Sequence, residues 1–292
     1  MTAPPLVQGL RPRQWLKNLL VLAAPIMAGQ ILERTVLIAT VIAFVAFCAA
    51  ASAIYALNDV LDVAADRENP RTRQRPVAAG TLSARTALIA AAALAALALG
   101  LAAIAGPSLV AVVATYLALS TAYCLWLKRE PVLDIAIIAS GFLLRAIAGG
   151  VAGGIELSQW FLLAASFGSL FMAAGKRYAD VVSAASSAPA GASAGSPAGG
   201  RAAYTATYLR FVWTLSAAVL ITTYGLWAFE VGAQHRPLPT ALSLAPFVLA
   251  VLRYALAIDA GRGGEPEEIA WADRVLQSLA LVWIVLVALA VY

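Results

Sequence analysis

Three aspartates lie close together within residues 55–80, where an apolar segment gives way to a charged one. Asp59, Asp62 and Asp66 have the spacing i, i+3, i+7, which places their carboxylates on one face of a helix. Asn58 precedes them directly. Like charges on one face repel one another unless a cation lies among them, and Mg²⁺ prefers such hard oxygen donors. We therefore expect these four residues to be the ligands of Mg²⁺.

Several arginines follow the aspartates at once, and guanidinium groups bind phosphate through paired hydrogen bonds. An aspartate face followed by arginines therefore predicts a site for a phosphate-bearing substrate held partly through a divalent cation. A solvated loop with scattered charges is the alternative, although ordinary loops do not align three carboxylates at the end of an apolar segment. The arginines of this run are Arg67, Arg71, Arg73 and Arg75.

The composition is that of a protein with several membrane spans. The chain is 62% hydrophobic and 12% charged, about half the charge of a soluble domain. About nine apolar segments approach the roughly 20 residues that a membrane-spanning helix needs. We predict an all-α membrane bundle in a single domain over residues 1–292, in which Pro25 kinks the first segment. The segments are 16–32, 35–57, 84–105, 108–127, 132–154, 158–176, 204–230, 239–258 and 270–291.

The basic residues are divided unevenly between the two sides of this predicted bundle. Nearly all of the 20 Lys and Arg residues lie on the connections of one side, with Arg34 and Arg236 opposite. The positive-inside rule assigns the basic side to the cytoplasm. We therefore expect a multi-pass protein of the inner (plasma) membrane whose site faces the cytoplasm. Residues 181–203, rich in Ala, Ser, Gly and Pro, predict a flexible linker on that side.

Two basic side chains begin or interrupt apolar segments. Arg145 lies inside segment 132–154, where a charge costs at least about 2.5 kcal/mol, so we expect it to face a polar cavity and bind an anion. Asp134 lies about three turns earlier on the same face of this segment. A structural ion pair between Arg145 and a carboxylate of another helix is the alternative. Lys17 begins the first segment, where it is either an interfacial anchor or a phosphate contact, and both roles are compatible.

The sixth segment ends in a charged sequence, GKRYAD. Asp180 lies one helical turn after Lys176, which suggests a second metal carboxylate beside a lysine that holds phosphate. Side chains that extend to the membrane surface and a local ion pair are the alternative. Cys48 and Cys124 lie inside apolar segments without metal-ligand spacing, so we expect both to be small buried side chains.

The motifs resemble one known family. Residues 58–66, NDVLDVAAD, are similar to NDxxDxxxD, the first aspartate-rich motif of the UbiA superfamily of intramembrane prenyltransferases. RQRPVAAG, at 73–80, resembles the RPxxxG stretch that follows that motif. The resemblance covers nearly the whole chain and implies a UbiA-like bundle. The second motif departs from the family's DxxxD, because KRYAD at 176–180 has lysine in the first position.

One branch of the superfamily shares this departure. LRPRQWLKNLLVLAAP, GFLLRAIAGG and GKRYAD resemble the decaprenyl-phosphate phosphoribosyltransferase branch. The resemblance implies transfer of 5-phosphoribosyl from phosphoribosyl pyrophosphate to decaprenyl phosphate, for the arabinan of the cell wall. It also implies that Asp59, Asp62 and Asp66 are catalytic, with Mg²⁺ on the diphosphate. The substrate-binding residues expected from the resemblance and the charge pattern are Lys17, Asn58, Arg67, Arg75, Arg145, Lys176, Arg177, Tyr178 and Asp180.

Two other functions are compatible with parts of the sequence. An aromatic prenyltransferase of quinone or haem biosynthesis would share the first motif, but it would use a polyprenyl diphosphate and an intact second motif. A transporter or lipid-binding scaffold also tolerates an intramembrane arginine, but it predicts inverted repeats and sites reachable from both sides. We expect a lipid bilayer and no nucleic acid as partners, and small-residue helix faces are compatible with a homo-oligomer.

Overall fold

The computed structural model describes residues 4–70, 72–186, 204–234, 236–261, 269 and 272–292. These residues form helices and no strands, so the all-α prediction is confirmed. The predicted linker at 181–203 begins with helix, since 181–186 belong to the eighth α-helix, and its remainder lies outside the described residues. The elements are α1 (Pro5–Leu10), η1 (Pro12–Leu22), α2 (Ala23–Met27), α3 (Arg34–Leu61), α4 (Val63–Glu68), α5 (Ala84–Ala105), α6 (Pro107–Leu125), η2 (Leu127–Arg129), α7 (Leu133–Gly153), α8 (Gln159–Ser186), α9 (Ala206–Gln234), α10 (Pro237–Asp259) and α12 (Arg274–Val291).

Most of the predicted spans are long apolar helices. Among the described residues, seven helices have the length and hydropathy to cross a membrane, namely α3, α5, α6, α7, α9, α10 and α12. The chain is therefore an integral membrane protein. The predicted segment 158–176 corresponds to the first part of α8, which begins at Gln159 and continues to Ser186.

The predicted segment 16–32 differs in form from the spanning helix expected there. It is divided between the 3₁₀-helix η1 and the short α2, with Pro12 at the start of η1 and Pro25 inside α2. A 3₁₀-helix places side chains three residues apart on the same face. Asn18 and Val21 are both buried on that face, and Trp15 donates to the hydroxyl of Ser52 over 3.0 Å.

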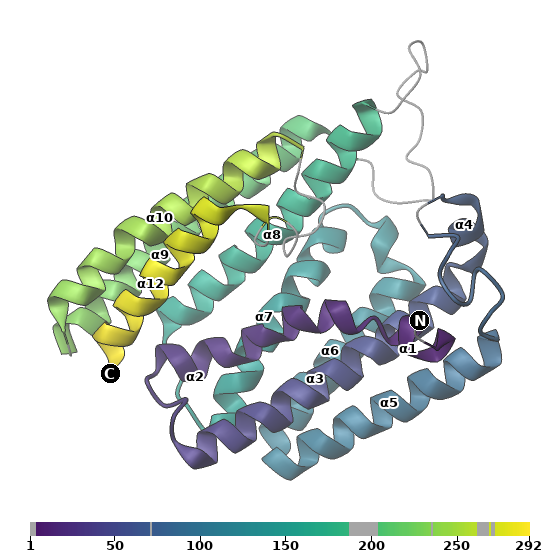
Figure 1. Ribbon diagram of the computed structural model, residues 1–292, viewed down its shortest axis with the longest axis horizontal. Coiled ribbons are helices and arrows are strands. Elements are labelled where there is room, and N and C mark those ends of the chain that lie inside the picture. The colour runs from purple at the N-terminus through teal and green to yellow at the C-terminus, as the bar shows by residue number, and fades with distance from the viewer. Residues whose placement is uncertain (1–3, 71, 187–203, 235, 262–268, 270–271) are drawn as a thin grey trace.

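The helices form two groups that meet at α7 (Figure 1). In the first group, α3 packs against α5 around a core that contains Phe47, Leu109 and Tyr116. In the second group, α8 packs against α9 and α10 against α12, as the green and yellow ribbons show. Ile135 and Ala148, both on α7, belong to the second and the first core respectively. This helix therefore supports residues on both sides of the space between the groups.

A glycine allows η1 to lie directly against α7. A Cβ added to Gly149 would lie only 1.7 Å from the carbonyl oxygen of Val21. Real Cβ atoms do not approach a backbone oxygen so closely, so any larger residue there would separate the two elements. The close approach brings the N-terminal segment beside the middle of α7, which carries Arg145.

The charged ends of the helices gather on one side of the bundle. Ion pairs between elements on that side join Arg11 to Asp59, Lys128 to Asp62 and Arg177 to Asp134. The second group contributes two more pairs, Arg210 with Asp259 and Arg253 with Asp273. We therefore expect a functional site built from charged residues on this side of the molecule.

Candidate active site

A cavity of about 320 Å³ lies between the N-terminal segment and the helices α3, α6, α7 and α8. Its wall is strongly basic, with five Lys or Arg side chains and one carboxylate, from Asp180. Apolar side chains such as Ile54, Ile138 and Met172 form the rest of the wall together with aromatic ones. Such a cavity suits a substrate that carries several negative charges. The basic residues are Arg11, Lys17, Arg145, Lys176 and Arg177.

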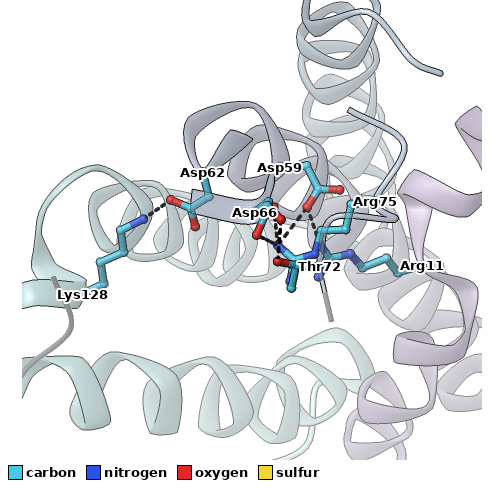
Figure 2. Close-up of polar contacts among 7 residues, drawn as sticks. All are labelled: Arg11, Asp59, Asp62, Asp66, Thr72, Arg75 and Lys128. Carbon is cyan, nitrogen blue, oxygen red and sulfur yellow. Dashed lines mark hydrogen bonds and ion pairs between the residues drawn. The ribbon is translucent and has the colours of Figure 1, made fainter. Parts of the chain in front are cut away.

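The aspartate motif begins at the end of α3, next to the cavity, because Asn58 and Arg11 line the cavity and Arg11 pairs with Asp59. Figure 2 shows the contacts of the three aspartates. The Nη1 atom of Arg75 lies 2.7 Å and 3.0 Å from the carboxylate oxygens of Asp66, and 3.5 Å from Oδ1 of Asp59. Arg11 makes a second ion pair with Asp59, whose side chain is only 2% exposed. The carboxylates of Asp59 and Asp66 therefore converge on one guanidinium.

The third aspartate points elsewhere, which corrects the prediction of one continuous helical face. α3 ends at Leu61, and Asp62 has φ −99° and ψ 9°, outside helical geometry, before α4 begins at Val63. Asp62 pairs with Lys128 at the end of α6, away from Asp59 and Asp66 (Figure 2). A break of one residue is enough to turn the side chain, because the i, i+3, i+7 alignment requires an uninterrupted helix.

The donor set fits a divalent cation in its chemistry. The carboxylates of Asp59 on α3 and Asp66 on α4 converge on the guanidinium of Arg75, and carboxylate oxygens are the hard ligands that Mg²⁺ takes. Asn58 adds an amide oxygen at the cavity wall. No group of three or more His, Cys, Asp or Glu is gathered for a metal ion among the described residues. In this arrangement Arg11, Arg75 and Lys128 neutralise the carboxylates instead.

Arg145 is buried in the inner wall of the cavity and is held by neutral partners. Its Nε donates to Oδ1 of Asn18 over 2.7 Å, and its Nη2 donates to the hydroxyl of Tyr116 over 3.1 Å. The ring of Tyr116 also lies under the guanidinium, 4.8 Å away. Asp134, which lies on the same face of α7, pairs with Arg177. Within the described residues Arg145 therefore has no carboxylate partner, and its charge is available to an anion.

Arg177 joins α8 to the start of α7. Its Nη2 lies 2.6 Å from Oδ1 of Asp134, a fully buried carboxylate that also accepts from the hydroxyl of Tyr123 at 3.3 Å. The other oxygen of Asp134 is buried without a hydrogen-bond partner. Asp180 lies 3.9 Å from Arg177 on the next turn of α8. Arg177, Lys176 and Asp180 all reach the cavity wall.

A family profile identifies the fold. The profile of the UbiA prenyltransferase family matches residues 19–279, most of the chain and all of the residues around the cavity except Arg11 and Lys17. The chain belongs to the UbiA prenyltransferase family. The resemblance seen in the two motifs is therefore confirmed, and with it a bundle of the UbiA type.

Relatives within the UbiA family are similar over nearly their whole length. A Corynebacterium glutamicum protein named decaprenyl-phosphate phosphoribosyltransferase is 50% identical over 98% of this chain and 86% of its own. A Mycobacterium tuberculosis protein of the same name is 48% identical over 100% of this chain and 97% of its own. A solved UbiA homolog from Archaeoglobus fulgidus, bound to GPP and Mg²⁺, has a TM-score of 0.75 at 18% identity, covering 98% and 99% of the two chains. Its likeness shows the UbiA fold.

The UbiA fold places some predicted residues at the cavity and others outside it. Lys17, Asn58, Arg145, Lys176, Arg177 and Asp180 line the cavity, and the three aspartates and Arg75 lie beside it. Arg67 instead donates to the carbonyl of Ala78 over 3.1 Å. Tyr178 is buried behind the wall, where it receives a hydrogen bond from Arg210 at 2.6 Å. These last two contacts are structural, so a role in binding substrate stays a prediction for Arg67 and Tyr178.

Sequence reasoning missed four residues of this UbiA site. Arg11 and Lys128 were counted only as loop charges, yet they pair with Asp59 and Asp62. Tyr116 and Tyr123 lie within the apolar α6, where a tyrosine gives no sign of which partner its hydroxyl has. The LRPRQW sequence, which contains Arg11 beside the segment that carries Lys17, was the one available signal.

Proposed function

We propose that this chain transfers the 5-phosphoribosyl group of phosphoribosyl pyrophosphate to decaprenyl phosphate. The products are decaprenylphosphoryl-5-phosphoribose and pyrophosphate, and the lipid product serves arabinan synthesis in the cell wall. The names of the relatives from C. glutamicum and M. tuberculosis support this transfer, because the chain is about half identical to them over nearly its full length. Membership of the UbiA family supports a reaction in which a diphosphate leaves while a lipid substrate lies within the bundle.

The observation that carries the proposal is the excess of positive charge around the cavity. Five basic side chains face one carboxylate there. Phosphoribosyl pyrophosphate carries a 5-phosphate as well as its diphosphate, and decaprenyl phosphate adds another phosphate. A prenyl diphosphate with an aromatic acceptor carries fewer negative charges. Lys176, in the place of the usual aspartate of the second motif, moves the balance further towards phosphate binding.

Each group of residues has a role in this reaction. Lys176, Arg177 and Arg145 bind phosphate oxygens along the wall, and the aspartates with Asn58 would hold Mg²⁺. Mg²⁺, when bound, neutralises the charge that develops on the leaving diphosphate. The nearby carboxylates of Asp59 and Asp66 stabilise the positive charge that builds up on the ribosyl ring.

The bond changes need no basic side chain. An oxygen of decaprenyl phosphate attacks the anomeric carbon, and the bond from that carbon to the diphosphate breaks with its electron pair leaving on the diphosphate. The acceptor is already an anion, so no proton has to be removed from it. The apolar part of the wall, including Ile54 and Met172, lies against the lipid acceptor and keeps water away from the anomeric carbon.

The position in the cell follows from the distribution of charge. The ion-paired side of the bundle is the basic side, and the positive-inside rule assigns it to the cytoplasm. We propose that the chain lies in the plasma membrane with its cavity open to the cytoplasm. Phosphoribosyl pyrophosphate, a soluble and highly charged donor, then reaches the site from the water side.

The proposal is tested by transfer of label into lipid. Purified protein in detergent receives phosphoribosyl pyrophosphate labelled in its ribose, Mg²⁺ and decaprenyl phosphate, with and without EDTA. Label should enter the lipid phase only when metal and acceptor are both present. Transfer of a prenyl group from a prenyl diphosphate to an aromatic acceptor, with no labelled lipid, would overturn the substrates and favour the aromatic prenyltransferase function instead.

A further inference from the structure

Each carboxylate of the aspartate motif is paired with a basic side chain in this structure. Asp66 pairs with Arg75, Asp62 with Lys128, and Asp59 with Arg11 (Figure 2). A divalent cation that binds these oxygens competes with the basic side chains for the same lone pairs. At least one basic side chain must therefore leave its carboxylate when the cation arrives, and the structure indicates which one.

Arg75 is firmly held. Its side chain contacts both oxygens of Asp66 as well as Asp59. The hydroxyl of Thr72 in turn donates to the carbonyl of Asp66 over 3.2 Å. Hydrogen bonds therefore join Asp66, Thr72 and Arg75 to one another within a short stretch of chain. Arg75 does not line the cavity.

Arg11 is placed differently. It is the residue between α1 and η1, and its backbone has φ 52° and ψ 60°, in the left-handed region that residues other than glycine rarely adopt. Its side chain pairs with the one carboxylate of Asp59 and lies 5.0 Å from the centre of the Tyr55 ring. Unlike Arg75, it lines the cavity. Rotation of this side chain alone would move its charge from the carboxylate towards a bound phosphate.

We propose that Arg11 exchanges partners during the reaction: it pairs with Asp59 before the cation binds, and it binds the donor's diphosphate once the cation has taken Asp59. This inference rests on the proposed function, because it requires a cation and a diphosphate at the site. Arg11 is then a substrate-binding residue that also keeps the buried carboxylate neutralised in the substrate-free protein. Since a coupling between two ligands is reciprocal, cation and diphosphate each strengthen binding of the other through this side chain.

The test follows from the two opposite roles of Arg11. Arg11→Gln removes the competitor for Asp59 and also removes a phosphate ligand. Calorimetric titration of Mg²⁺ into the donor-free variant should give a Kd about threefold lower than that of the wild type, by loss of the competing pair. Titration of inorganic pyrophosphate in saturating Mg²⁺ should give a Kd about tenfold higher, by loss of a charged hydrogen bond. Arg11→Lys should return both values towards those of the wild type.

Arg73→Gln is the matched control. Arg73 is exposed, belongs to the basic run that follows the aspartates and makes no ion pair within the described part of the chain. A through-space effect of one lost charge would change the Kd values for Mg²⁺ and pyrophosphate alike in both glutamine variants. Partner exchange changes these Kd values only in Arg11→Gln. An unchanged or higher Kd for Mg²⁺ in Arg11→Gln would overturn the inference, and so would an unchanged Kd for pyrophosphate.

These binding measurements do not depend on the identity of the donor. If both shifts occur but wild-type protein transfers no phosphoribosyl label, the exchange stands and the proposed substrates fall. If label is transferred but the Mg²⁺ affinity of Arg11→Gln is unchanged, the proposed function stands and the exchange falls. Wild-type protein that binds no Mg²⁺ would overturn both.

Discussion

Arg145 Nε donates a hydrogen bond of 2.7 Å to Oδ1 of Asn18, and this contact ties the middle of α7 to the N-terminal 3₁₀-helix. Asn18 is fully buried, and its amide nitrogen donates to the sulfur of Cys48 over 3.2 Å. The amide is neutral, so it orients the guanidinium without cancelling its charge. That distinction separates a structural arginine from an anion-binding one.

Asn18→Asp tests whether the uncancelled charge serves binding. A carboxylate of the same size keeps the contact with Arg145 but neutralises it, so thermal stability should be retained. The KM for phosphoribosyl pyrophosphate should rise about tenfold, the cost of one charge-assisted contact. Steady-state kinetics with a thermal unfolding curve measure both quantities. An unchanged KM would mean that Arg145 has a structural role alone.

Asp62→Asn tests the role of the aspartate that points away from the other two. Its side chain is 27% exposed, so the substitution should change the unfolding temperature little. Transfer of labelled phosphoribosyl should fall by about 100-fold, since even the outer partners of metal ligands cost up to that much when removed. Glu68→Gln is the control, because Glu68 is exposed in the same stretch and should leave transfer unchanged. Near wild-type transfer by Asp62→Asn would exclude Asp62 from the metal site.

The pair of Asp134 and Arg177 combines a structural and a functional part that can be separated. Asp134→Ala should lower the free energy of unfolding by about 3–5 kcal/mol, because it leaves the guanidinium buried without its partner. The double variant Asp134→Leu with Arg177→Met should recover most of that loss. Transfer should stay impaired in the double variant, because the cavity wall has lost a phosphate ligand. Denaturation in sodium dodecyl sulfate and the label assay give the two readouts, and full transfer by the double variant would contradict the role of Arg177.

Asp273 gives a pH dependence outside the membrane spans. Arg253 donates to its carboxylate over 2.7 Å, and this bond with the backbone N–H groups of Leu276 and Val275 holds the pKa of Asp273 below its usual value. A lowered pKa in the folded state stabilises the protein above the unfolded pKa of about 3.9, and the gain is lost as pH falls through the folded value. Asp273→Asn should therefore lower the unfolding temperature at pH 7, with a difference from wild type that shrinks below pH about 4. A difference that is constant with pH would contradict this.

Much of the fold could be predicted from the sequence, because membrane-spanning helices are recognised by the length of their apolar segments. The spans at 84–105 and 133–153 match their predicted segments within a few residues. The N-terminal segment was not predictable in the same way, because hydropathy does not distinguish a 3₁₀-helix from an α-helix. Pro25 was the signal available within it, and a proline indicates a kink without specifying the geometry.

The sequence predicted which residues line the cavity better than it predicted which side chains form ion pairs with one another. Arg145 and Lys176 were expected at a polar cavity, and both line one. The ion pair considered as a structural role for Arg145 does not form among the described residues, and the buried Asp134 pairs with Arg177 from α8. Contacts between helices depend on how the helices pack, and periodicity within one helix carries no information about its neighbours. For that reason the pairing of Arg11 with Asp59 was also out of reach.

The 3₁₀ form of η1 sets how far the N-terminus extends from its attachment at Gly149. Its 11 residues rise about 2.0 Å each, against about 1.5 Å in an α-helix, so the segment is about 5 Å longer than the α-helix the same residues would form. That extra length is close to the size of a guanidinium group. The stretched helix acts as a spacer of fixed length between the membrane interior and the water side, and the same 11 residues wound as an α-helix would draw Arg11 back from the carboxylate it neutralises.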